Sequence, residues 1–114
     1  MSPLMKVQRV LDVFRSHDEI MPSQRIEAFL LVAMRKRMTT EQIAEDLGIH
    51  LSAARRNLAA LGEHPYRINL QEWRGLGWLK CAPDPNEPRR MSWTLTIQGK
   101  RIVEQIETII GGGR

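Results

Sequence analysis

Residues 38–61, MTTEQIAEDLGIHLSAARRNLAAL, predict two short helices joined by a tight turn. Thr39 can cap the first helix together with Gln42, three residues later, which is the capping-box pattern. Gly48 can end this helix in a left-handed conformation that is sterically open to glycine. Ser52 can cap the second helix, whose apolar side would be formed by Ala54, Leu58 and Leu61. The stretch therefore predicts a helix-turn-helix, whose second helix usually enters the major groove of DNA; an ordinary helical hairpin is the alternative.

Basic side chains are concentrated in the part of the chain that follows the predicted turn. Residues 1–49 hold seven basic and seven acidic side chains, whereas residues 50–101 hold nine basic and four acidic ones. Residues 102–114 hold one basic and two acidic side chains. A local basic excess is typical of a protein that binds a phosphate backbone. A solvated basic surface is the alternative.

Length and composition limit the class of protein. A chain of 114 residues suits one domain. The single cysteine, Cys81, cannot form an internal disulfide, as expected in a reducing cytosol. No apolar run approaches the ~20 residues that span a bilayer, and the N-terminus lacks a signal-peptide pattern. We therefore expect a cytoplasmic, nucleoid-associated protein with no membrane contact.

Amphipathic helices are predicted around the motif. The first would start at Ser2 and Pro3 and end near Ser16, a second would open at Pro22, and the last would be capped by Thr96. The apolar stripes of the two terminal helices are wide for short helices, so they can contribute to a homodimer contact. The residues expected in that contact are Leu4, Val7, Leu11 and Phe14 from the first helix and Ile102, Ile106, Ile109 and Ile110 from the last.

A β-hairpin is predicted between the motif and the last helix. Residues 78–82 and 91–96 have strand character, and the second segment alternates apolar and polar side chains. The connecting PDPNEPRR is stiffened by three prolines and ends in Arg89 and Arg90. Such a hairpin needs a docking partner, and Trp78, Trp93 and Leu95 would supply the face that packs on the helices. The predicted fold class is mainly α with a small β-hairpin (α+β), a winged helix-turn-helix.

The whole chain is expected to form a single winged-helix domain. Residues 1–17 would form the N-terminal helix with its possible dimer contact, residues 22–96 the winged helix-turn-helix, and residues 97–114 the C-terminal helix and glycine tail. Within the second part, residues 62–69 predict a loop and residues 70–74 a short helical turn.

The second helix of the motif and the hairpin supply candidate DNA-binding side chains. Arg55 and Arg56 are about 100° apart on a helix, so at least one should face DNA, where arginine can donate two hydrogen bonds to guanine. Asn57 can pair with adenine in the same way or be a satisfied polar residue at the helix edge. Arg89 and Arg90 can reach phosphates or the minor groove. The expected DNA-binding residues are His50, Ser52, Ala53, Arg55, Arg56, Asn57, Arg89 and Arg90.

Four segments of the sequence resemble the MarR-type transcriptional regulators. They are PSQRIEAFLLV, TTEQIAEDLGIHLSAARRNLAAL, RGLGWLK and DPNEPRRMSWTLTIQGKRIVEQI. The residues and the resemblance together predict a homodimeric, sequence-specific regulator that binds double-stranded DNA. We expect a repressor that blocks polymerase by occupying its operator, although activation is compatible with the same residues.

The hairpin carries the most specific part of this resemblance. It has an Asp84-Pro85 turn, an acid at Glu87 followed two residues later by Arg89, and a Leu-Thr-x-x-Gly corner at residues 95–99. The acid would brace the arginine, so an internal ion pair of Arg89 with Glu87 or Asp84 is the alternative to a DNA contact. The family usually has Asp where this chain has Glu87.

The sequence contains no arrangement that indicates catalysis, so we do not expect an enzyme. It has no Ser-His-Asp pattern, paired carboxylates in an apolar setting or phosphate-binding glycine loop. His17, His50, His64 and Cys81 lack metal-ligand spacing, and we expect no cofactor. Cys81 is expected to be a small buried residue, with redox sensing as the alternative. A protein-interaction module of a transcription, replication or phage complex and an effector- or redox-responsive repressor remain alternative functions.

Overall fold

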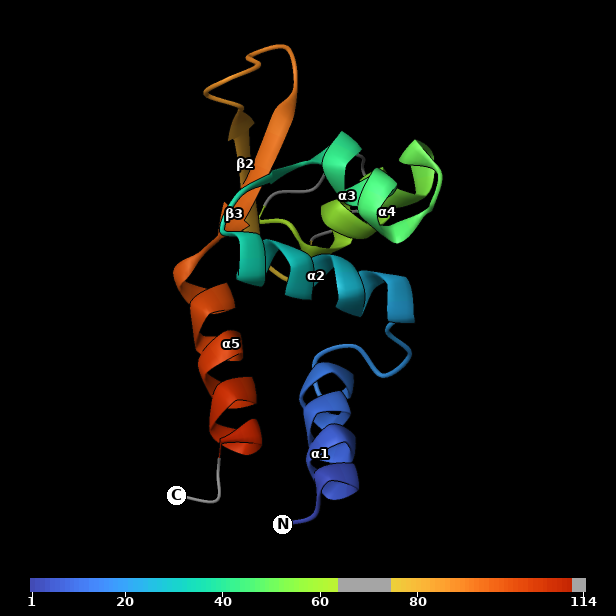
Figure 1. Cartoon of the computed structure of the whole chain (residues 1–114), viewed down its shortest axis with the longest axis vertical. Coiled ribbons are helices and arrows are strands. Elements are labelled where there is room, and N and C mark those ends of the chain that lie inside the picture. The colour runs from blue at the N-terminus through green and yellow to red at the C-terminus, as the bar shows by residue number, and fades with distance from the viewer. Residues whose placement is uncertain (64–74, 112–114) are drawn as a thin grey trace.

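The computed structural model describes residues 1–63 and 75–111 (Figure 1). Its elements are α1 (Pro3–Arg15), α2 (Ser23–Arg35), β1 (Met38–Thr39), α3 (Thr40–Leu47), α4 (Leu51–Leu61), β2 (Leu79–Pro83), β3 (Met91–Leu95) and α5 (Ile97–Ile110). The predicted fold class, mainly α with a small sheet, is confirmed. None of the helices in the described residues combines the length and apolar character needed to cross a membrane.

The molecule has two parts, which we call the head and the stalk. The head consists of α2, α3, α4 and the three strands, and the stalk consists of α1 and α5, which pack side by side and project from the head (Figure 1). The loop between β2 and β3 extends from the opposite end of the head and forms the wing. The N-terminus and the C-terminal end of α5 lie at the free end of the stalk.

The sheet has one strand more than the sequence predicted. Its order is β1-β3-β2, with both pairs antiparallel. The two-residue β1 pairs Met38 with Trp93 and leads directly into α3, but a strand this short shows no alternation that a sequence could reveal. The Trp93 Nε1–H donates to Thr40 Oγ1 at 3.0 Å, so β3 is also bound to the start of α3.

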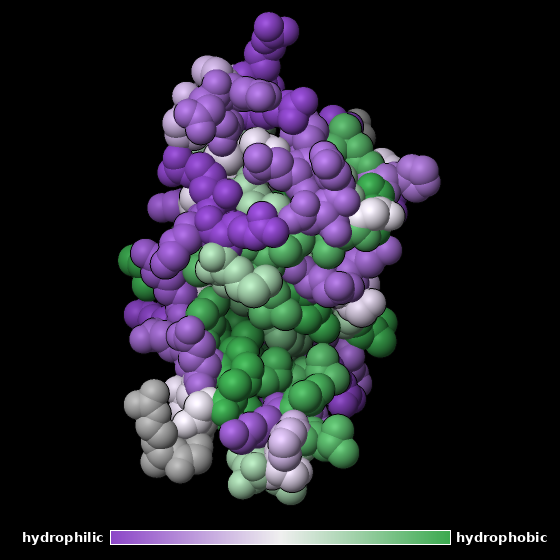
Figure 2. Space-filling view, in the orientation of Figure 1, coloured by the Kyte–Doolittle hydropathy of each residue, from purple (hydrophilic) through white to green (hydrophobic). Residues whose placement is uncertain are grey.

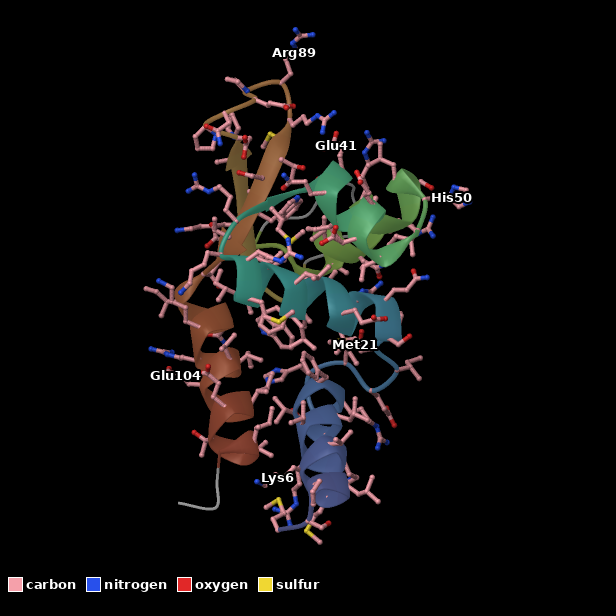
Figure 3. The ribbon with its side chains drawn as sticks, viewed as in Figure 1. Lys6, Met21, Glu41, His50, Arg89 and Glu104 are labelled. Carbon is pink, nitrogen blue, oxygen red and sulfur yellow. The ribbon has the colours of Figure 1, made fainter. Side chains whose placement is uncertain are left out.

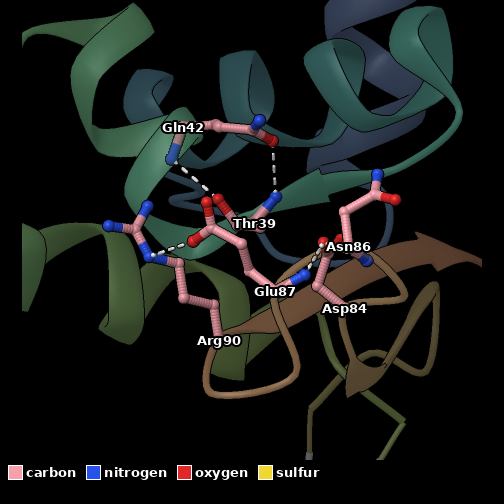
Figure 4. A network of polar contacts seen from close by, with 6 residues as sticks. All are labelled: Thr39, Gln42, Asp84, Asn86, Glu87 and Arg90. Carbon is pink, nitrogen blue, oxygen red and sulfur yellow. Dashed lines mark hydrogen bonds and ion pairs between the residues drawn. The ribbon is translucent and has the colours of Figure 1, made fainter.

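The first helix of the motif begins and ends as predicted. Thr39 Oγ1 accepts a hydrogen bond from the Gln42 N–H at 3.1 Å, and Gln42 Oε1 accepts one from the Thr39 N–H at 2.9 Å (Figure 4). These two bonds form the capping box. Gly48 follows the helix at φ 65°, a left-handed conformation that favours glycine.

The second helix of the motif begins earlier than predicted. Its N-cap is His50, which makes no side-chain capping bond, and Ser52 lies within the first turn. The prediction that Ser52 caps this helix is therefore wrong. The turn is short because the Ile49 N–H donates back to the Ala44 carbonyl at 3.0 Å, which returns the chain to the helical direction after only three residues.

An aromatic cluster joins the stalk to the head. Phe14 of α1 lies 5.9 Å from Phe29 of α2 and 5.9 Å from Trp78, measured between ring centroids, and Phe29 lies 5.1 Å from Trp78. All three side chains are fully or almost fully buried. Trp93 is also buried and Leu95 partly so, so the predicted docking face of the hairpin is confirmed.

A corner at Thr96 joins β3 to α5. Thr96 Oγ1 accepts from the Gly99 N–H at 3.0 Å and donates to the Gly77 carbonyl at 2.6 Å. A Cβ atom on Gly99 would collide with the Trp78 carbonyl oxygen, so the position accepts only glycine without rearrangement. The Leu-Thr-x-x-Gly pattern therefore has a local physical basis.

The predicted dimer residues do not share one environment. Phe14, Ile102 and Ile106 are buried within the single chain, and Ile109 is partly buried. The assignment of Phe14, Ile102 and Ile106 to a subunit contact is therefore wrong, because they form the core between stalk and head. The side chains that stay exposed are Leu4 at 83%, Val7 at 58%, Leu11 at 43% and Ile110 at 56%. Figure 2 shows apolar residues gathered over the stalk.

The segment that follows α4 is described only at its two ends. The Glu63 N–H donates to the Leu79 carbonyl at 2.7 Å, and the Leu76 N–H donates to the Ala60 carbonyl at 2.8 Å. The predicted loop beyond Glu63 and the helical turn at residues 70–74 lie outside the described residues.

Candidate nucleic-acid interface

α4 buries one side and presents the other to solvent. Its buried side includes Ala54, Leu58 and Leu61, all with no exposed surface, as the sequence predicted. Arg55 and Arg56 are exposed. Since the buried residues hold the helix against α2 and α3, the two arginines are fixed on a rigid element at the surface of the head.

The other residues predicted at the start of α4 occupy different environments. His50 and Ser52 are exposed, and Ala53 is partly buried. Figure 3 shows His50 at the outer end of α4, pointing away from the head. These three positions surround the N-terminal end of the helix, where backbone N–H groups favour a negatively charged partner.

Asn57 does not lie on the exposed side of α4. Its side chain is only 6% exposed, and its Oδ1 accepts a hydrogen bond from Arg25 Nε at 3.1 Å. The assignment of Asn57 as a DNA-binding residue is therefore wrong, and the alternative of a satisfied polar residue is confirmed. The reason is its position on the helix, three residues after Ala54 and four before Leu61, which places it on the buried side.

The wing loop is held in shape by its own polar groups (Figure 4). Asp84 Oδ2 accepts from the Asn86 and Glu87 N–H groups, each at 3.0 Å. The Asp84 N–H donates to the Arg90 carbonyl at 2.8 Å, and the Arg90 N–H donates to the Glu87 carbonyl at 2.9 Å. Since Asp84 is buried, the loop is preorganised rather than free to collapse.

The two wing arginines have different roles within the loop. Arg90 Nε lies 3.1 Å from Glu87 Oε2, so the acid pairs with Arg90 rather than with Arg89. Both side chains of the pair are largely exposed, and such a pair stabilises the fold by only about 0–1 kcal/mol. Arg89 extends from the tip of the wing (Figure 3), so its guanidinium is available to a partner.

A surface hollow of about 530 Å³ lies between α3, α4 and the wing. We call it the basic hollow, because four of its lining residues are Arg55, Lys80, Arg89 and Arg90. Glu41 and Glu63 also line it. The Oε1 atom of Glu41 is buried with no hydrogen-bond donor in the described part of the chain. The four cationic and two carboxylate side chains leave the lining with a net positive charge, and arginine and lysine can donate hydrogen bonds to phosphate oxygens.

Lys80 is a residue of this hollow that sequence reasoning missed. It lies on β2 opposite Thr94 of β3, and its side chain is exposed. The sequence offered one signal for Lys80, a positive charge in the strand that precedes the arginine-tipped loop. Whether this side chain faces α4 depends on the register of the sheet, and the sequence does not provide that register.

Cys81 is exposed at the surface of the head and lines the basic hollow. The prediction that it is buried is wrong, because β2 is an edge strand with only Leu79 buried. Protein atoms around the sulfur still exclude part of the solvent, and this burial raises the pKa of the Cys81 thiol. The thiol is therefore protonated at neutral pH and is a weak nucleophile. Within residues 1–63 and 75–111, no cluster of His, Cys, Asp and Glu side chains could hold a metal ion.

Comparison with known proteins identifies the fold. No family model matches the sequence, and no curated protein matches it significantly. A cysteine-to-serine mutant of MarR from E. coli has a TM-score of 0.63 and 22% identity over 95% of this chain and 69% of that chain. The same mutant complexed with operator DNA has a TM-score of 0.60 at 22% identity, covering 94% and 69% of the two chains. The PcaV regulator from Streptomyces coelicolor has a TM-score of 0.62 at 17% identity, covering 97% and 76%.

Proposed function

We propose that this chain, which has the winged-helix fold of the MarR-type structures, is a sequence-specific regulator that binds double-stranded DNA. The observation that carries the proposal is the basic hollow. It brings Arg55 of α4, Lys80 of β2 and both wing arginines to one face of the head. A MarR mutant of similar fold was crystallised in complex with operator DNA, which supports DNA as the partner of this chain.

In the proposed complex, α4 enters the major groove with Arg55 and Arg56 toward the bases. A bidentate arginine–guanine contact contributes about 1–3 kcal/mol of base discrimination. The preorganised wing then places Arg89 at the backbone or in the minor groove. Arg90 and Lys80 line the hollow between these two contacts, where they neutralise phosphates.

The proposed regulator is a homodimer. Its contact uses exposed apolar side chains of the stalk, which are Leu4, Val7 and Ile110 toward the free end and Leu11 nearer the head. Contiguous exposed apolar side chains mark interaction sites. A two-fold dimer would place two α4 helices on half-sites about one helical turn, roughly 34–36 Å, apart. The unit of the dimer would be one winged-helix domain, with residues 22–96 contacting DNA and both terminal helices joining the subunits.

The proposed mechanism is repression by occlusion in the cytoplasm. A dimer that covers a promoter excludes polymerase without any further chemistry. The raised pKa of the Cys81 thiol disfavours the redox-responsive alternative, because oxidants react with the thiolate.

Salt-dependent DNA binding tests the proposal. With Lys80, Arg89 and Arg90 of each head on phosphates, a dimer makes about six such contacts, so affinity should fall by about 10³-fold between ~50 and ~200 mM salt. Selection of bound sequences should yield a palindrome. Arg56→Ala should relax base preference, whereas Arg89→Ala should weaken binding to all duplexes and reduce the salt slope. Arg15→Ala is the matched control, because Arg15 is an exposed arginine on the stalk.

Alkylation of Cys81 gives an independent readout of the same face. The sequence contains no other cysteine, so a thiol reagent reports on the basic hollow alone. Bound operator should slow the alkylation several-fold at mildly alkaline pH, where a thiol of raised pKa begins to ionise. An unchanged alkylation rate with DNA bound would place the DNA elsewhere. Absence of any DNA binding at low salt would instead favour the protein-interaction module, with the free end of the stalk as its docking surface.

A further inference from the structure

A chain of three polar side chains connects the stalk to α4 through α2. Arg25 of α2 donates from Nε to Asn57 Oδ1 at 3.1 Å and from Nη1 to Asp18 Oδ2 at 3.4 Å. Asn57 is buried on α4, and the Arg25 and Asp18 side chains are 20% and 33% exposed. The arginine therefore bridges the loop that follows α1 and the helix that carries the proposed base contacts.

Each end of this chain is rigidly attached to its own element. The Asp18 N–H donates to the Phe14 carbonyl at 3.1 Å, and the Asp18 carbonyl accepts from the Met21 N–H at 3.1 Å. Asp18 thus moves with the end of α1. At the other end, Asn57 follows Arg56 directly and is held by the buried side of α4.

Stability alone is a weak explanation for these groups. Burying a polar side chain requires desolvation that its hydrogen bonds only roughly offset. Apolar replacements of buried ionic groups are often neutral or stabilising. What a hydrogen-bonded arginine provides beyond apolar packing is a defined geometry, because its planar donors fix the direction of both acceptors.

We propose that Asp18, Arg25 and Asn57 are positioning residues that fix the angle of α4 relative to the stalk. This inference rests on the proposed function, in which the stalk joins two subunits. In such a dimer, the angle between stalk and α4 sets the distance between the two recognition helices. The three residues would then determine which half-site spacing the regulator accepts, without any contact with DNA.

The other contacts near the stalk hold the C-terminal end of α4. Phe14 packs against Phe29 and Trp78, and the Trp78 N–H donates to the Leu61 carbonyl at 2.9 Å. The Arg25 bridge adds a side-chain connection to the middle of α4, so weakening it should leave the fold intact while loosening the angle of this helix.

The first test measures the distance between the two heads without DNA. A spin label on Ser52→Cys in a Cys81→Ser background, at an exposed position of α4, reports the distance between the two α4 helices by double electron–electron resonance. Asn57→Leu removes the acceptor for Arg25, and Asn57→Asp keeps it. We expect a broader distance distribution for N57L than for wild type, and a wild-type width for N57D. Equal widths in all three proteins would overturn the inference.

The second test measures spacing selectivity on DNA. Wild type, N57L and N57D are each bound to the selected operator and to versions with one base pair added or removed between the half-sites. Wild type and N57D should lose at least about tenfold in affinity on the altered spacings. N57L should discriminate several-fold less. An unchanged ratio in N57L would contradict the inference.

A general loss of stability would lower the affinity for every spacing equally and leave the ratio constant, so the ratio separates positioning from folding. Arg25→Met is a second variant that removes both bonds while keeping an unbranched side chain at this position. Failure of the two proposals is distinguishable. A wild-type chain that neither dimerises nor binds DNA overturns the proposed function and this inference with it. A wild-type dimer with a preferred spacing that N57L and R25M share overturns only the inference.

Discussion

The two ends of the stalk have the same apolar pattern but different surroundings. At the head end, Phe14 of α1 and Ile102 of α5 are buried in the core. At the free end, Leu4 and Ile110 are exposed. Helical periodicity determines which side of a helix is apolar, but it does not determine what covers that side. The difference separates residues that stabilise one chain from residues that are available to a second one.

At the free end of the stalk, α1 and α5 are joined by an exposed hydrogen bond, whereas at the head end they are joined by buried apolar side chains. Lys6 Nζ donates to the Ile110 carbonyl at 2.8 Å in an exposed position, where such bonds contribute little. The apolar residues around this bond gain little from their own chain. A subunit partner that covered these side chains would stabilise the complex by about 25 cal/mol for each Å² of apolar surface removed from water.

The largest effect on the unfolding free energy is expected from Phe14→Ala. Phe14 is fully buried against Phe29 and Trp78, and Phe→Ala substitutions in cores cost about 3–5 kcal/mol. Denaturant unfolding at low protein concentration measures the effect on the single chain. Leu4→Ala is the control from the free end, where the change should stay within about 0.5 kcal/mol. Similar losses in both variants would mean that the two ends do not differ.

A smaller effect is expected from Ile106→Val at the buried face of α5. Ile106 is almost fully buried, and removal of one buried methyl group costs about 0.5–1.5 kcal/mol. The same change at Ile110, four residues later and exposed, should alter the unfolding free energy by less than about 0.5 kcal/mol. Denaturant midpoints of the two variants compare one substitution at both ends of one helix. A larger loss from Ile110→Val than from Ile106→Val would mean that the core extends to the free end of the stalk.

The local parts of the fold could be predicted from the sequence. The capping box of Thr39 and Gln42, the left-handed Gly48 and the corner between Thr96 and Gly99 each depend on residues within four positions of one another. Helix ends with such side-chain patterns are specified locally. The predicted start of α4 was wrong by two residues, because the N-cap is His50, which makes no side-chain capping bond, and not Ser52.

The candidate site was only partly predictable, because its geometry depends on distant contacts. Asn57 lies 32 positions from Arg25, the donor that satisfies it, and no local pattern reveals that pair. Glu87 pairs with Arg90 instead of Arg89, because the direction of each side chain follows from the shape of the loop. The exposure of Cys81 follows from the position of β2 at the edge of the sheet, which strand propensity alone does not provide.

The smallest effect on the unfolding of a single chain, and the sharpest test of the free end, is expected from Val7→Ser. Val7 is exposed in the single chain, so its unfolding free energy should change by less than about 0.5 kcal/mol. In a dimer that buries the exposed part of Val7 in both subunits, the loss would be about 1–1.5 kcal/mol for each side chain, which weakens association by about one to two orders of magnitude. Sedimentation equilibrium measures this change directly. Gln8→Ser changes the adjacent exposed polar residue and should leave association nearly unaffected. If Val7→Ser left the dissociation constant unchanged, the exposed stripe would not be the subunit contact, and its residues would be available to a different partner.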